Sequence, residues 1–298
     1  MSTPDNQRRE HPSAYFVQDR SNQEEMTRLQ IQDHMLTAGM GGVLSEQPDP
    51  ASFQRVLDVG CGTGGWLIEV AKAYPTIKLL IGVDVSGKMV HYARAQAEAQ
   101  GVSDRVEFHV MDALRMLEFP NAFFDLVNQR FGVGYLRTWE WPKLLSEYQR
   151  VSRPGKVIRI TESTLGNESN SPALRRLSDL LLQTLHQAGN AFTPDADGII
   201  GALEPMLRQH GLQNLQTRTH ALHYRAGTPE GQHFYEDMRL AFRTLLPFLR
   251  RWTRVPDDYE EIYQQALREM QQPDFEVRWK LLTVWGKRGP YIASAMRQ

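Results

Sequence analysis

The chain has 298 residues, longer than most single domains, so we expect either one large domain with insertions or a domain that carries a cap. Hydrophobic residues make up 41% of the chain and charged residues 23%, values typical of a globular protein rather than of a disordered or fibrous one. Because 34 Lys and Arg residues are balanced by 35 Asp and Glu residues, the net charge is -1, and the basic excess expected of a nucleic-acid-binding protein is missing.

Cysteine content and hydropathy restrict the compartment and the kinds of site. Cys61 is the only cysteine, so the chain cannot build a disulfide framework or a zinc site from cysteines, and we expect no metal. The sequence holds no run of about 18 or more apolar residues, and its polar start, MSTPDNQRREHPS, does not resemble a secretory signal. We therefore expect a cytoplasmic protein without a membrane span.

A helix is expected before the first strand. Ser21 is followed three residues later by Glu24, a spacing typical of a capping box at the start of a helix. The apolar positions that would then share one face are Met26, Leu29 and Leu36. The glycine-rich run 39–42 ends this helix as a loop or a hinge.

The stretch Arg55–Trp66, RVLDVGCGTGGW, reads as a buried strand that runs into a glycine-dense turn and then a helix. Gly60, Gly62 and Gly64 can take positive φ and let a ligand lie against the main chain. In the helix that follows, apolar residues recur at helical spacing until Pro75.

Four further strands alternate with helices. Their expected ranges are 78–85, 106–110, 124–127 and 156–162, and a crossover helix is expected over Trp141–Val151. This alternation predicts a doubly wound parallel α/β sheet, with ligands bound beyond the carboxyl ends of the strands.

The second half of the chain is less regular. Amphipathic helices are expected at about 174–186 and 199–210, and strands at 212–224 and 275–284. Between those two strands lies a helical segment, about 229–272, which is too long for a hairpin loop. We interpret it as an insertion that covers the site.

These elements suggest four parts. Residues 1–50 are an N-terminal tail and a cap helix, and residues 51–225 are the core, with a helical insertion at about 170–190. Residues 226–272 are a helical cap insertion, and residues 273–298 are the final core strand and the C-terminus.

Taken literally, Gly60, Gly62 and Gly65 satisfy a GxGxxG pattern, so a dinucleotide site has to be considered. The surroundings favour another ligand. Asp58 lies inside the strand before the glycines, which is unusual for a dinucleotide-binding strand, and Asp112 adds an acidic position after the third strand.

Five motifs in order resemble the class I S-adenosylmethionine-dependent methyltransferases: LDVGCGTGG, GVDVS, HVMDAL, FDLVNQRF and RVSRPGKVIRITE. The resemblance covers about Phe53 to Glu162 and resumes weakly in FEVRWKLLTVWGKRG. It implies a Rossmann-like seven-stranded sheet whose last strand is antiparallel, helical cap insertions, and S-adenosyl-L-methionine as the cofactor.

The resemblance also implies a set of cofactor-binding residues at the carboxyl ends of the strands: Gly60, Cys61, Gly62, Asp84, Val85, Met89, Asp112, Ala113, Asn128, Gln129 and Arg130. The resemblance implies that Asp84 accepts hydrogen bonds from the two ribose hydroxyls, since an ionised carboxylate is an acceptor well suited to a diol. Val85 and Met89 flank the adenine, and Asp112 and the Ala113 amide bind its edge.

The acidic positions have structural alternatives. Asp84 also fits a charge at a helix N-terminus, and Asp112 also fits a turn. We expect Asp58 to hold the glycine turn rather than to touch the ligand.

Methyl transfer is a direct displacement on a sulfonium methyl, so the protein has mainly to align the acceptor with the cofactor. A base is needed only if the acceptor must lose a proton. The candidates for a catalytic role are Tyr15, Arg130, Glu162 and His186, and each also fits a structural role.

The acceptor is expected to be a small molecule, because the inserted helices resemble those of methyltransferases in secondary metabolism. Nucleic-acid amino methylation is disfavoured, since Asn128-Gln129-Arg130-Phe131 stands where such enzymes carry an acidic or Asn residue, two prolines and an aromatic. Two features suggest an anionic or aromatic acceptor: aromatic density in the second half, and four arginines that would share one face of a straight helix. These arginines are Arg239, Arg243, Arg250 and Arg254.

Pro247 would bend that helix, and a solvated face is the alternative. Two other functions stay open: a nicotinamide-dependent oxidoreductase and a non-catalytic protein that keeps the fold for binding. The sequence does not determine the oligomeric state, and a homo-oligomer is compatible with it.

Overall fold

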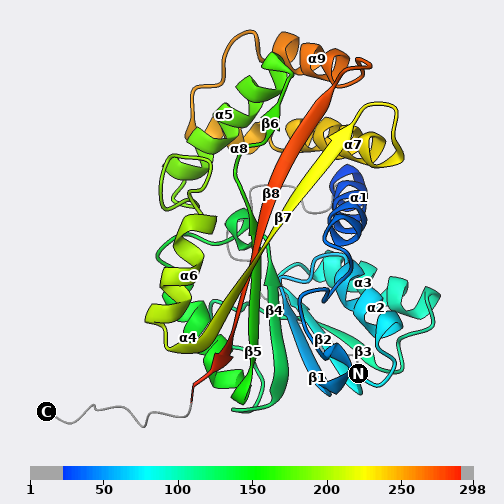
Figure 1. Cartoon of the computed structure of the whole chain (residues 1–298), viewed down its shortest axis with the longest axis vertical. Coiled ribbons are helices and arrows are strands. Elements are labelled where there is room, and N and C mark those ends of the chain that lie inside the picture. Colours follow the sequence, from blue (N-terminus) through cyan, green and yellow to red (C-terminus); the bar gives the residue numbers. More distant parts are fainter. Residues whose placement is uncertain (1–22, 290–298) are drawn as a thin grey trace, which may run out of the picture.

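The computed structural model describes residues 23–289. Two of the positions discussed above, Tyr15 and Ser21, lie outside these residues. Figure 1 shows an elongated molecule in which a twisted sheet with its flanking helices forms one end, and a group of helices around the far ends of β7 and β8 forms the other. Of the helices in the described part, none combines the length and hydropathy needed to cross a bilayer.

Five parallel strands form one half of the sheet, in the order β3-β2-β1-β4-β5. They are β1 (Arg55–Val59), β2 (Leu79–Asp84), β3 (Val106–Val110), β4 (Phe124–Arg130) and β5 (Ser152–Ser163). The helices between them are α2 (Gly65–Ala73), α3 (Gly87–Ala99) and α4 (Trp141–Val151), with 3-10 turns at Pro50–Ser52 and Gly132–Gly134. The predicted doubly wound pattern is therefore present, with β4 and β5 longer than expected.

The other half of the sheet is antiparallel. β8 (Glu276–Arg288) pairs with β5 and with β7 (Leu212–Arg225), and a two-residue strand β6 (Glu168–Ser169) also pairs with β8. The last strand runs antiparallel, as the resemblance implied. The sheet has eight strands rather than seven because the backbone of β6 adds to the free edge of β8 beyond the end of β5.

The two faces of the parallel strands bury different partners. Val56 on one face packs with α2 and α3 residues, whereas Leu57 on the other packs with α4 and α6 (Ile200–Gln209). Neighbouring residues alternate in this way because successive side chains of a strand point to opposite faces. Both faces are covered by helices, which explains the nearly continuous apolar strands.

Side-chain caps start several of the helices. The Ser86 hydroxyl accepts from the Met89 amide at 3.4 Å, and the Ser171 hydroxyl accepts from the Leu174 amide at 3.0 Å. At the start of the insertion, the Thr228 hydroxyl accepts from the Gly231 amide at 3.0 Å. Each cap satisfies an amide that has no partner inside its helix.

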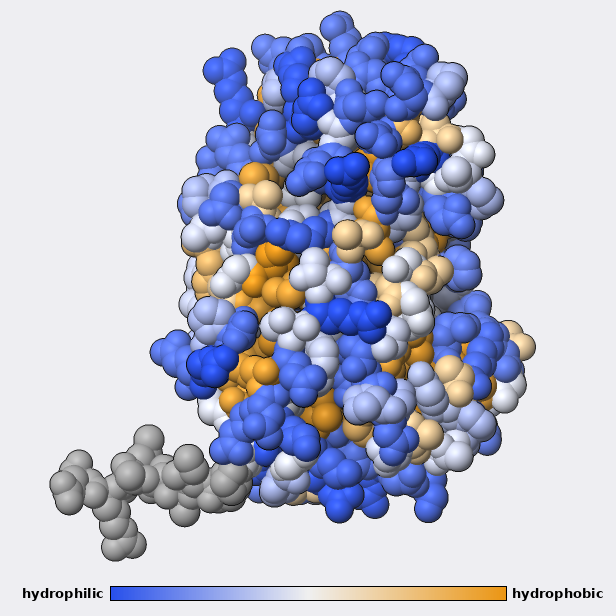
Figure 2. Space-filling model, viewed as in Figure 1, coloured by the Kyte–Doolittle hydropathy of each residue, from blue (hydrophilic) through white to orange (hydrophobic). Residues whose placement is uncertain are grey.

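A second hydrophobic core lies in the cap. It is built from α1 (Gln23–Gly39), α5 (Pro172–Gln187), α7 (Pro229–Thr244), α8 (Leu246–Trp252) and α9 (Tyr259–Glu269) around the ends of β7 and β8. In Figure 2 hydrophilic residues cover most of the visible face, and hydrophobic residues show in seams between them. The apolar faces of the cap helices are therefore turned inward.

The four arginines expected on one helix do not share one. Pro247 lies in the first turn of α8, so the insertion breaks into α7 and α8 at this point. Arg239 pairs with Glu236 on its own helix, and Arg243 pairs with Glu24 of α1. The bend expected at Pro247 is therefore present, and the alternative of a single arginine face is not formed.

The inward face of α1 also differs from the prediction. Met26 and Leu29 are only partly buried, whereas Glu25 and Arg28 are buried beside Leu36. The Arg28 guanidinium donates to both carboxylate oxygens of Glu25 at 2.8 Å, and to Asp237 of α7 at 3.0 Å. This ion cluster joins α1 to the cap, and without partners its charges could not be buried.

Replacing Arg28 should therefore lower the stability of the cap. We expect Arg28→Met to lower the free energy of unfolding by about 3–5 kcal/mol, because two buried carboxylates lose their cation. Urea denaturation measures the change. The matched control is Arg176→Met: Arg176 and its partner Asp258 have side chains 59% and 47% exposed, and the change should stay within about 0.5 kcal/mol. A similar small change for Arg28→Met would contradict this view of α1.

Candidate active site

A pocket of about 380 Å³ opens at the carboxyl ends of β1, β2 and β4. It is lined by the glycine turn after β1 and by residues of α1 from the cap. Nine of the predicted cofactor residues line it: Gly60, Cys61, Gly62, Asp84, Val85, Met89, Asp112, Ala113 and Arg130. Residues from four separate motifs are thus brought to one cavity.

Backbone hydrogen bonds hold the glycine turn against β2. The amides of Gly60 and Cys61 donate to the Val83 carbonyl oxygen at 2.9 and 3.0 Å. Gly60 and Gly62 have φ of 71° and 52°, which glycine adopts without strain. A Cβ at Gly60 would lie 2.6 Å from the Tyr135 hydroxyl, so glycine is needed there for space as well.

Two acidic side chains shape the turns at the strand ends. Asp84 accepts from the Gly62 amide at 3.0 Å through Oδ2 and from the Ser86 amide at 2.8 Å through Oδ1. Asp112 accepts from the Leu114 amide at 2.9 Å. Both side chains also line the pocket. Each therefore stabilises a turn and lies where a ligand-binding residue is expected.

Asp58 does not hold the glycine turn, and that expectation is wrong. The turn amides bond to β2 instead, whereas Asp58 Oδ1 accepts from the Asn128 side-chain amide at 2.8 Å. Asp58 lines the pocket and is only 4% exposed. Burial raises the pKa of its carboxyl to about 7.

Residues 56–155 match a protein family described as Methyltransferase domain. This part of the chain is a methyltransferase domain. Ajmaline N-methyltransferase of Rauvolfia serpentina is 32% identical over 160 residues, which cover 53% of each chain. Demethylmenaquinone methyltransferase of Lactiplantibacillus plantarum is 38% identical over 114 residues, covering 38% of this chain and 47% of the relative. The chain spans about half the length of the curated relatives it matches.

A solved structure from Galdieria sulphuraria shares the fold of the methyltransferase domain and of the elements around it. It is provisionally assigned as a sarcosine dimethylglycine methyltransferase, and it superposes with a TM-score of 0.51 over 86% of this chain and 87% of that one. The two sequences are 13% identical, so the similarity concerns the fold alone.

Asn128 and Gln129 lie outside the pocket of the methyltransferase domain. Both are fully buried, and they point to opposite faces of β4. Asn128 bonds to Asp58, whereas the Gln129 side-chain oxygen accepts from the Tyr148 hydroxyl at 2.6 Å. Both side chains therefore lie inside the protein and do not line the cavity.

Of the four catalytic candidates, Arg130 is the one that the described structure places in the pocket, where it pairs with Asp33 of α1. Glu162 is fully buried and does not line the cavity. His186 is exposed on α5, and Tyr15 lies outside the described residues. Within residues 23–289 no three His, Cys, Asp or Glu side chains are grouped to hold a metal.

Glu162 instead holds the turn after β4. Its carboxyl oxygens accept from the Gly132 amide at 2.5 Å and from the Val133 amide at 3.4 Å. Just before these amides, Phe131 has φ of 55°, a left-handed conformation that is uncommon for an aromatic residue. Phe131 lines the pocket and also packs against the cap core, so the held turn sets one wall of the site.

Sequence reasoning missed the wall contributed by α1 and by aromatic residues. The lining residues that it did not name as site residues include Arg28, Leu29, Gln32, Asp33, Trp66 and Tyr135. The four α1 residues reach the pocket through the packing of the cap on the core, so no local signal identifies them, whereas Trp66 and Tyr135 come from the core itself.

The carboxyl of Glu162 makes stability depend on pH. Burial raises its pKa from 4.5 to about 8, so its contribution to folding is complete below about pH 4.5 and is lost as the pH rises through 8. Between about pH 6 and pH 9, the free energy of unfolding of wild type should fall by about 2 kcal/mol relative to that of Glu162→Gln. Urea denaturation at several pH values measures this difference.

The control is Glu168→Gln, at an exposed position on β6. Its difference from wild type should stay flat over the same range. A flat difference for Glu162→Gln as well would contradict the buried state of that carboxyl.

Proposed function

We propose that this chain transfers a methyl group from S-adenosyl-L-methionine to a small-molecule acceptor. One observation carries the proposal: residues of the matched methyltransferase domain converge on a pocket beyond the carboxyl ends of β1, β2 and β4. In open parallel sheets this is where ligands bind.

The proposed cofactor site consists of Gly60, Cys61, Gly62, Asp84, Val85, Met89, Asp112 and Ala113, joined by Arg130 at the reacting end. The cavity fits such a ligand. A Cβ added at Gly62 would meet nothing within 4 Å, so the backbone there is open to the pocket. Val85 leaves 39% of its surface exposed, which suits a flat ring lying against it. Asn128 and Gln129 are left out because their side chains are buried away from the cavity.

S-adenosylmethionine supplies the reactive methyl group and its own good leaving group. The task of this chain is to hold the acceptor in line and to keep water away, which can account for several kcal/mol of the barrier. In our proposal α1, Phe131 and Trp66 do this, because they line the pocket together with the glycine turn. Arg130 is balanced by Asp33, so its charge does not oppose the cation of the methyl donor.

The acceptor that we propose is small and at least partly aromatic or apolar. Trp66, Phe131 and Tyr135 line the pocket, whereas the arginine face that would favour an anion is not formed. Relatives named ajmaline N-methyltransferase and Methyltransferase pytC of Aspergillus terreus support a role in secondary metabolism. The single free Cys61 suits a reducing compartment, and we propose the cytoplasm.

The nicotinamide-dependent oxidoreductase and the non-catalytic binding protein are not favoured. The matched family and the relatives above are methyltransferases. Transfer of labelled methyl from S-adenosylmethionine to a panel of small aromatic acceptors, with calorimetry using S-adenosylmethionine and NADH, tests the choice. Binding of NADH without binding of S-adenosylmethionine would overturn the proposal.

A sharper test concerns Asp84. We expect Asp84→Asn to weaken the binding of S-adenosylhomocysteine by at least ~1 kcal/mol, because the ribose would lose a charged hydrogen-bond partner. Titration calorimetry gives the affinity, and thermal unfolding shows whether the Gly62 and Ser86 contacts survive. The control is Asp104→Asn, whose side chain is 72% exposed and does not line the pocket. Unchanged affinity in Asp84→Asn would remove Asp84 from the proposed site.

A further inference from the structure

A row of polar side chains crosses three adjacent strands directly below the pocket. Asp58 of β1 is in register with Asn128 of β4, and Asn128 is in register with Arg159 of β5. All three therefore point to the same face of the sheet. The row nearer the amino ends of these strands is apolar: Val56, Leu126 and Val157. The polar row thus separates the hydrophobic core from the cavity.

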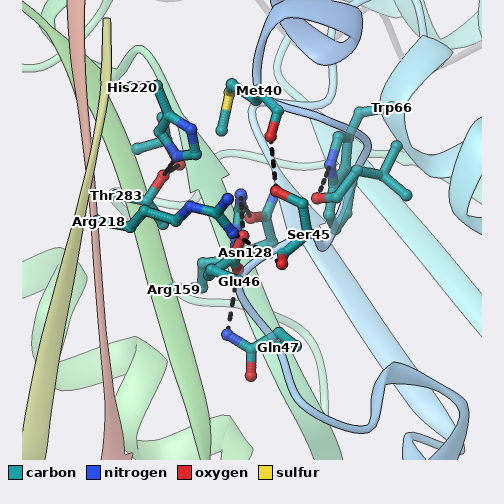
Figure 3. Close-up of polar contacts among 12 residues, drawn as sticks. Met40, Ser45, Glu46, Gln47, Trp66, Asn128, Arg159, Arg218, His220 and Thr283 are labelled. Atoms are coloured by element: carbon teal, nitrogen blue, oxygen red, sulfur yellow. Dashed lines mark hydrogen bonds and ion pairs between the residues drawn. The ribbon is translucent and has the colours of Figure 1, made fainter.

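Hydrogen bonds connect this row into one chain. Arg159 donates to Glu46 at 2.7 Å and to the Asn128 side-chain oxygen at 2.7 Å, and Asn128 donates to Asp58 at 2.8 Å. Figure 3 shows Arg159 beside Asn128 and Glu46, which comes from the loop after α1, and Arg159 bonds to both. The side chains of Arg159 and Glu46 are 0% and 1% exposed, so water does not weaken the pair.

Arg159 determines which way the Asn128 amide points. A guanidinium can only donate hydrogen bonds, so the amide oxygen must face it. The amide nitrogen is then turned toward Asp58, where it donates to the carboxylate. In the opposite orientation the amide nitrogen would face the Arg159 guanidinium, donor against donor, and the amide oxygen would face the Asp58 carboxylate, acceptor against acceptor.

Charged groups from several elements act on Asp58. Burial raises the pKa of its carboxyl, while Arg130, the Asn128 hydrogen bond and Arg159 lower it, and Asp33 raises it. Cys61, Tyr135 and Tyr148 also lie near Asp58; burial raises their pKa values, so they stay uncharged. Asp84 is a second carboxylate that lines the same pocket. The charge of Arg159 is the weakest of these influences, so the main link from Arg159 to Asp58 is the oriented amide of Asn128.

We propose that Arg159 is a positioning residue of the cofactor site: it fixes Asn128 as a donor to Asp58 and so presents a carboxylate to the cationic part of the methyl donor. Glu46 balances the charge of Arg159 from the opposite side. This inference rests on the proposed function, because it takes the pocket to bind S-adenosylmethionine or its product.

The pH dependence of binding provides the readout. S-adenosylhomocysteine carries an ammonium group, and a nearby cation favours the ionised form of Asp58. Its affinity should therefore be highest above the pKa of about 7 and should fall up to roughly tenfold per pH unit below it. Calorimetry with S-adenosylhomocysteine from about pH 5.5 to about pH 9 gives the midpoint, in parallel with thermal unfolding.

Two variants should move this midpoint in opposite directions. The double variant Glu46→Leu with Arg159→Met removes the cation and its partner together, so the midpoint should rise by about half a pH unit or more. Glu46→Gln leaves the charge of Arg159 unbalanced, so the midpoint should fall by a similar amount. Loosening of the fold alone would not give opposite shifts. The control is Thr283→Val, a buried residue that bonds to Thr161 next to this row and should not move the midpoint.

A measurement on wild type decides the matter if the double variant does not fold. The side-chain amide signals of Asn128 in an NMR titration should shift with the same midpoint as binding, because Asn128 bonds directly to Asp58. If they do not shift, or if both variants keep the wild-type midpoint, Arg159 has no positioning role. If wild type does not bind S-adenosylhomocysteine, the proposed function is wrong, and the NMR titration still tests the link from Asn128 to Asp58.

Discussion

The ladder of hydrogen bonds along β8 is the constraint on which the rest of the structure depends. One end of β8 pairs with β5 and closes the parallel core, and the other end continues past Ser163, paired with β7 as far as Arg225. The cap helices pack around this extension, as Figure 1 shows. Because β8 belongs both to the core sheet and to the cap, the cap has a fixed position relative to the carboxyl ends of β1, β2 and β4. That place brings α1 over the pocket.

Arg28 and Arg130, the two arginines among the described residues that line the pocket, each have at least one carboxylate partner. Arg130 of β4 forms an ion pair with Asp33 of α1. Arg28 of α1 forms ion pairs with Glu25 of the same helix and with Asp237 of α7. An unbalanced charge at this depth would carry a large desolvation cost. Pairing with these carboxylates leaves the pocket without a strong positive field.

Trp66 connects the two arginines on this face of the sheet. Its ring lies 5.8 Å from the guanidinium carbon of Arg130 and 5.9 Å from that of Arg159, and its indole N–H donates to the Val43 carbonyl. Buried polar groups of this kind seldom add much stability, but each has a defined partner and so selects one arrangement. The site therefore rests on a layer of directional contacts rather than on apolar packing alone.

The sequence by itself determined the strands, the glycine turn and the positions of Asp84 and Asp112, because periodicity and turn-forming residues act over a few neighbours. Tertiary structure alone decided which residues of β4 reach the cavity. Arg130 lines the pocket, whereas Asn128 and Gln129 turn inward to opposite faces. It also decided which face of α1 is buried, since Arg28 finds Asp237 only after the chain has folded. A local sequence pattern cannot specify a partner that distant in the chain. Strand register and helix packing therefore determine which residues line the pocket.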